Sequence, residues 1–110
     1  MNDFQMLELA AKAAGYEVGF LRNSGCFYRR EEDIGCEDWN PLDDDGDALR
    51  LAANLRLEII PGKHFGDGCS VNSKRHQAPG VTVFRDSKDM AEQMRRAITM
   101  AAAEIGRSME

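Results

Sequence analysis

A stretch near the middle of the chain, residues 39–55, joins an acidic loop to an amphipathic helix. Asn40 is a suitable helix N-cap, because its side-chain oxygen can accept from an unpaired backbone N–H, and Pro41 suits the first helical position. Gly46 weakens that first turn, so a helix that begins one turn later is the alternative. Apolar residues then recur with helical spacing, at Ala48, Leu51, Ala52 and Leu55. Such a stripe has to be buried, which predicts packing against a globular core.

Four aspartates in this stretch, Asp43, Asp44, Asp45 and Asp47, raise the question of a calcium site. If Asp43 were the first ligand of a calcium loop, Ala48 would replace the required glycine and Asn54 the bidentate glutamate. The spacing therefore does not fit a calcium loop. Carboxylates at a helix N-terminus instead stabilise the helix by about 0.3–1 kcal/mol each. We expect a solvated, helix-capping loop, with no metal and no cofactor.

The acidic residues of the chain are concentrated between residues 31 and 47. This segment holds nine carboxylates and no Lys or Arg, whereas the whole chain carries −5, so the remainder carries +4. Nucleic-acid-binding modules show a basic stripe, which argues against a nucleic-acid partner. Charge of one sign steers association with a basic protein surface, although a solvated loop is the plain alternative. The partner-binding residues predicted on this ground are Glu31, Glu32, Asp33, Glu37, Asp38, Trp39, Asp43, Asp44, Asp45 and Asp47.

Length and composition indicate one soluble domain over residues 1–110. A chain of this length with 43% hydrophobic and 30% charged residues can bury a modest single core. No apolar run reaches the length of a membrane span, and the first residues do not resemble a signal peptide, so we expect a cytoplasmic protein. The three cysteines, Cys26, Cys36 and Cys69, form no C-x-x-C pair and suggest neither a disulfide framework nor a zinc site.

Apolar periodicity predicts three helices and four strands. The helices are expected at residues 3–14, in the second half of the 39–55 stretch, and after Asp86–Ser87; the strands at 16–22, 26–30, 57–59 and 80–85. The order α-β-β-α-β-β-α implies an α+β domain with a four-stranded, mainly antiparallel sheet. Helices on both sheet faces, in a three-layer α/β/α-like sandwich, would bury all three apolar stripes. A homodimer through the C-terminal helix would bury them as well.

Residues 61–79 show no clear periodicity and contain a compact group of basic residues: Lys63, His64, Lys74, Arg75 and His76. Positive side chains on a glycine-rich loop can bind a phosphate, although a surface excursion is the plain interpretation. The segment lacks the glycine and the final Ser or Thr of a Walker A loop. Cys69 with His64 or His76 would supply a nucleophile and a base, but nothing in such a loop holds them together, so we expect no enzyme.

Two stretches resemble a known group of proteins: 39–42 with 44–52, and 96–98 with 101–106. They resemble small phage and prophage proteins of unknown function, similar to the phage ABA-sandwich domain proteins. The resemblance implies a layered α/β/α domain made in a bacterial host cell, and it brings no catalytic residues. The basic loop 61–79 lies outside the resemblance.

These features favour a small phage or prophage accessory protein without enzymatic activity. The expected partner is a host or phage protein, bound through the acidic segment 31–47, with a host-inhibitory or anti-defence effect. The alternative is a protein that binds and sequesters a small molecule or nucleotide through loop 61–79.

Overall fold

The computed structural model describes residues 2–16, 18–21, 26–31, 35–61, 68–73, 78–83 and 89–109, with the backbone alone for the first three strands and for residues 78–79. Within these residues the elements follow the order α1 (Asp3–Ala14), β1 (Val18–Leu21), β2 (Cys26–Glu31), β3 (Gly35–Asp38), α2 (Asp45–Leu55), β4 (Glu58–Ile60), β5 (Cys69–Ser73), β6 (Ala78–Val83) and α3 (Met90–Ser108). The predicted α+β class and the positions of its three helices are confirmed.

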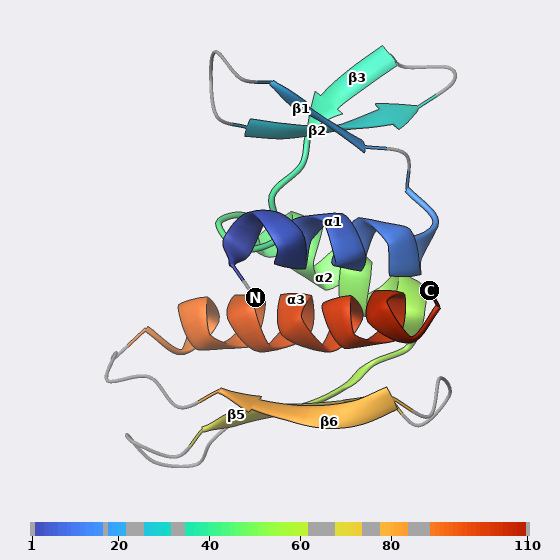
Figure 1. The fold of residues 1–110 in the computed structure, drawn as a ribbon. Helices are drawn as coiled ribbons and strands as arrows, with labels where there is room; N and C mark the ends of the chain where they lie inside the picture. The colour runs from blue at the N-terminus through green and yellow to red at the C-terminus, as the bar shows by residue number, and fades with distance from the viewer. Residues whose placement is uncertain are drawn as a thin grey trace.

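The strands form two sheets of three, and the helices lie between them (Figure 1). Sheet A has the order β1-β2-β3 and sheet B the order β4-β5-β6, and every pairing is antiparallel. The first two predicted strands, 16–22 and 26–30, pair with each other as a hairpin, with Phe20 opposite Phe27. The prediction of a single four-stranded sheet is wrong, because the described strands form two separate sheets. The prediction of an α/β/α sandwich is also wrong, because here the helices lie between two sheets and do not cover the two faces of one.

Two segments for which the sequence predicts no strand account for this difference. Residues 35–38, predicted as part of an acidic connection, pair with β2 and form β3. Residues 69–73, inside the predicted loop 61–79, form β5 at the centre of sheet B. Burial alternates along β5: the side chains of Cys69, Val71 and Ser73 are buried, and those between them are less so. Sheet B packs through β5 and β6 against α3.

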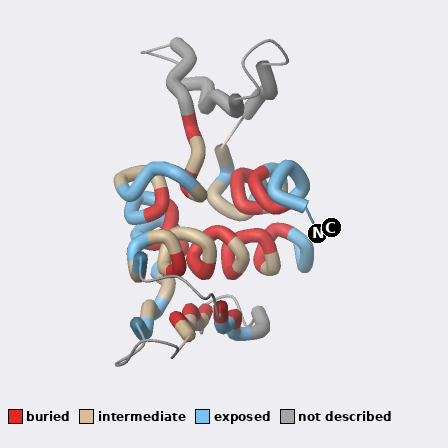
Figure 2. Tube along the Cα trace, turned by 90° about the vertical axis from the view of Figure 1, so that its left-hand side faces the viewer, coloured by how far each residue is buried: buried red, intermediate tan, exposed pale blue. Residues whose placement is uncertain are grey.

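Helix α3 is the central element of the fold, packed against α1, α2 and sheet B. It runs beside α1 in the same direction, because Arg96 bonds Asp3 near the start of α1 whereas Gly106 lies against Leu9 further along (Figure 1). Small residues line this contact on both helices. Figure 2 shows the buried residues gathered along the three helices and on the central strand of sheet B. None of the described helices has the length and apolarity that crossing a membrane requires.

The helix ends follow local capping rules. The side chain of Asn2 accepts from the backbone N–H of Gln5, and the Gln5 side chain accepts in turn from the Asn2 backbone, so Asn2 caps α1. Gly15 follows the predicted end of this helix at residue 14 and caps α1 in the left-handed conformation, at φ 77°. Helix α3 is capped by Asp89, beyond the predicted Asp86–Ser87 turn, and residues 84–88 lie outside the described part of the chain.

Candidate functional site

Within the acidic segment, Trp39 connects β3 to the turn before α2. Trp39 is only 2% exposed, and its ring lies nearly perpendicular to the Tyr16 ring, with centroids 5.9 Å apart. Tyr16 lies between α1 and β1, and Trp39 follows β3, so the two rings meet at the two connections between sheet A and the helices. Trp39 therefore belongs to the core, and its ring is not accessible to a partner.

The residues after Trp39 form a turn held by the side chain and backbone of Asn40. The Asn40 side chain accepts from the Leu42 N–H at 3.0 Å, and its backbone oxygen accepts from Asp43 and Asp44. Asn40 consequently starts a turn and does not cap the helix. The cap is Asp44, whose carboxylate accepts from the Asp47 N–H at 2.8 Å. The alternative of a helix that begins one turn later is confirmed.

The mostly buried carboxylate of Asp47 stabilises this turn. Its carboxylate accepts from the Asn40 N–H at 3.0 Å and from the Arg50 guanidinium at 2.8 Å, and only 13% of its side chain is exposed. Asp43 accepts from the side-chain amide of Asn40 at 3.2 Å. We define residues 40–47 as the acidic turn; its shape is fixed by hydrogen bonds to its own carboxylates.

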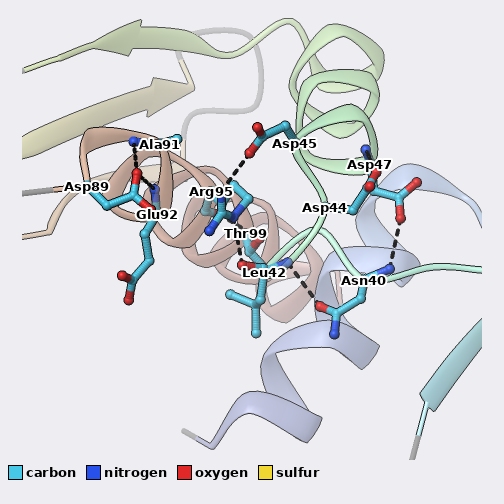
Figure 3. A network of polar contacts seen from close by, with 10 residues as sticks. All are labelled: Asn40, Leu42, Asp44, Asp45, Asp47, Asp89, Ala91, Glu92, Arg95 and Thr99. Atoms are coloured by element: carbon cyan, nitrogen blue, oxygen red, sulfur yellow. Dashed lines mark hydrogen bonds and ion pairs between the residues drawn. The ribbon is translucent and has the colours of Figure 1, made fainter.

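Arg95 of α3 connects the acidic turn to the core helix (Figure 3). Its Nε donates to the Leu42 carbonyl oxygen at 2.9 Å and its Nη1 donates to Asp45 at 2.6 Å. The hydrogen bond to Asp45 raises the pKa of Arg95 above its usual value, with Asp89 and Glu92 contributing further. The sequence gives no local signal for this contact, because Arg95 and Leu42 are 53 residues apart.

The outer carboxylates of the acidic turn face solvent. Asp43 is exposed, and the side chains of Asp44 and Asp45 are 59% and 74% exposed. The start of α3 adds Asp89 and Glu92 close to Arg95 (Figure 3). Among the described residues here, two guanidinium groups, Arg50 and Arg95, are thus accompanied by six carboxylates.

The remaining acidic residues lie elsewhere. Glu31, Glu37 and Asp38 are positions in strands of sheet A, where Glu37 is in register with Arg29 and Asp38 with Tyr28. Glu32 and Asp33 lie outside the described residues. The structure therefore separates the acidic segment 31–47 into a β part and a helical part, with buried Trp39 between them.

The predicted anion-binding residues Lys63, His64, Lys74, Arg75 and His76 all lie outside the described part of the chain. Cys69, between them in sequence, is fully buried in β5, and burial raises the pKa of its thiol above the ordinary value of 9.0. In the described ranges no group of three or more His, Cys, Asp and Glu side chains is placed to hold a metal ion.

Comparison with known proteins adds no relative. No family model matches the chain, and no match was found among the curated proteins or the solved structures.

Proposed function

We propose that this chain is a non-enzymatic accessory protein of phage or prophage origin that binds a host or phage protein in the bacterial cytoplasm. The acidic turn is the binding surface, and its partner presents a basic patch. The observation that carries this proposal is the combination of exposed carboxylates on Asp43, Asp44 and Asp45 with a backbone held in one shape.

The fixed shape matters because an ordered surface loses less conformational entropy on binding than a flexible charged loop. Trp39 anchors the acidic turn on one side and Arg95 on the other. Exposed carboxylates of one sign also raise the rate of encounter with a basic partner. Occupation of a basic surface that a host protein needs for its own ligand would inhibit that protein.

The variant Asp43→Asn with Asp44→Asn tests the proposal with little risk to the fold. Asparagine caps a helix as well as aspartate does, and its side-chain oxygen can still accept from the Asp47 N–H. The matched control, Glu8→Gln with Glu58→Gln, also removes two exposed carboxylates, on α1 and β4.

Each protein would be immobilised, exposed to bacterial lysate, and its retained complex weighed by native mass spectrometry. We expect one protein to bind the wild type and the control and to be lost from the Asp43/Asp44 variant. The same protein should dissociate between about 0.01 M and about 0.1 M salt, where the Debye length falls from about 30 Å to about 10 Å. An identical set of retained proteins for all three would refute the proposal.

A further inference from the structure

The outward face of α2 is apolar at its centre. Asp45, Leu49 and Ala53 follow at four-residue intervals, so they share one side of the helix, and all three are exposed. Leu49 is 65% exposed, more than any other large hydrophobic residue in the described part of the chain. A single exposed leucine is ordinary on a protein surface, so the residues around it on this face decide its role.

The N-terminal end of this face is negative. Asp44 and Asp45 stand at the start of α2 with exposed side chains (Figure 3). Arg50, the nearest cation on α2, is engaged by Asp47 at 2.8 Å and lies 3.9 Å from Asp44. Leu49 therefore lies one helical turn from exposed carboxylates, and a complementary surface has to present cations beside an apolar pocket.

The C-terminal end of the face carries a cation on a strained backbone. Arg56 follows Leu49 by seven residues, which returns to the same side of a helix, and it is exposed. Its φ of 57° makes it the one residue other than glycine with a positive φ in the described ranges. Glycine is the more stable choice for such a C-cap, so the arginine is retained at a cost to the fold. Strain of this kind is typical of binding surfaces.

We propose that the partner binds the outward face of α2, with Leu49 in an apolar pocket, the acidic turn against cations and Arg56 against a carboxylate. This inference rests on the proposed function and specifies the partner's surface. The partner is a folded protein whose pocket has basic side chains at one end and an acidic side chain at the other, about 16 Å apart. A second copy of this chain fits poorly, because its α2 offers only Arg50 and Arg56 against three exposed carboxylates.

Leu49→Ala tests the apolar contact. The protein that the wild type retains from lysate would be purified and its binding measured by surface plasmon resonance. We expect the dissociation rate to rise about tenfold or more, at low and at high salt alike, because the lost contact is apolar. Alanine maintains the helix. The matched control is Ile60→Ala on β4, which also shortens an exposed apolar side chain and should bind like the wild type.

Two variants of Arg56 separate its charge from its backbone conformation. Arg56→Gln removes the charge and keeps the left-handed strain, whereas Arg56→Gly removes both and should raise the melting temperature. Both should weaken binding by about two- to fivefold, the range of an exposed ion pair. If Arg56 acted only through the fold, the more stable Arg56→Gly variant would bind at least as well as the wild type.

The outcomes distinguish this inference from the proposed function. Wild-type binding by Leu49→Ala, together with loss of binding by Asp43→Asn with Asp44→Asn, would overturn the inference and leave the proposed function standing. Wild-type binding by both Arg56 variants would remove Arg56 from the surface and overturn the inference as stated. A wild type that retains no lysate protein would refute both, and a wild type that binds its own copies through Leu49 would replace the partner with a second copy.

Discussion

Gly106 of α3 lies directly against the Leu9 carbonyl group of α1. A Cβ at position 106 would collide with the carbonyl oxygen and stand 2.8 Å from the carbonyl carbon. The obstacle is backbone, which cannot move aside as a side-chain end can. This contact sets how closely the two parallel helices approach.

Gly106→Ala should therefore destabilise the protein, by about 1–3 kcal/mol, as overpacking in a tight core does. The loss outweighs the gain of up to about 1 kcal/mol in helix propensity. Urea denaturation followed by circular dichroism gives the free energy of unfolding. Gly46→Ala is the control, because the atoms nearest to its Cβ would be side-chain atoms of Arg50 and Asp44, the closest at 3.2 Å. Equal stability of the Gly106→Ala variant and the wild type would contradict the close approach.

Arg95→Met should destabilise the fold by about 1–2 kcal/mol, because it removes two hydrogen bonds while Asp45 keeps access to water. Arg95→Lys should recover only part of this loss, since an ammonium group lacks the planar fork that reaches both acceptors. The control is Arg107→Met, which removes an exposed pair with Glu104 at 3.6 Å and should cost little. The prediction fails if thermal unfolding ranks Arg95→Lys equal to the wild type.

Arg56 ends α2 in the left-handed conformation, at φ 57°. A side chain is strained there and glycine is not, so Arg56→Gly should raise the free energy of unfolding by about 0.5–1 kcal/mol. Arg56→Ala retains a Cβ and should give no such gain. The melting temperatures of the wild type, Arg56→Gly and Arg56→Ala would test this. A lower melting temperature for Arg56→Gly than for Arg56→Ala would show that the backbone at residue 56 is not strained.

Cys69 should resist thiol reagents while the protein is folded, because its side chain is fully buried. In a variant with Cys26→Ser and Cys36→Ser, the labelling rate of Cys69 should follow the rate of opening and rise sharply in denaturant. Its pKa is raised above 9.0 in the folded state, so the neutral thiol favours folding below pH 9.0. That contribution is lost as the pH rises through the folded-state pKa. Rapid labelling of native protein at pH 7 would disprove the burial.

Sheet A should be removable without unfolding the rest. Tyr16 and Trp39 stand together at its base, with ring centroids 5.9 Å apart. Replacement of residues 18–38 by about four Gly and Ser residues, which reach at most about 14 Å, should leave a cooperative unfolding transition. Fluorescence of Trp39 reports this directly, because the ring stays buried only if the core survives. The shortened protein also retains the acidic turn and should keep the proposed partner. A noncooperative transition would show that sheet A is part of the core.

The helices could be predicted because their signals are local, as in the apolar stripe of α2 and Gly15 after α1. Strand β5 could not, since Ser70, Asn72 and Ser73 have weak β propensity, and the pairing of β5 with both neighbours decides its conformation. Strand β3 could not be predicted for the same reason. Glu37 and Asp38 have low strand propensity, and it is the pairing with β2 that makes this segment a strand. The acidic turn was predicted by composition alone, whereas its attachment through Arg95 depends on the tertiary fold.

The parallel pairing of α1 with α3 has a consequence for the way the chain acquires its structure. Asp3 and Arg96, which bond across this pair, are separated by 93 residues. During synthesis α1 leaves the ribosome long before α3, which covers it. The apolar face of α1 therefore stays exposed until α3 has been made. Contacts so distant in sequence slow folding, and they leave unpaired strands and apolar surface open to association meanwhile. Chaperone dependence and inclusion-body formation on rapid expression are the expected outcome.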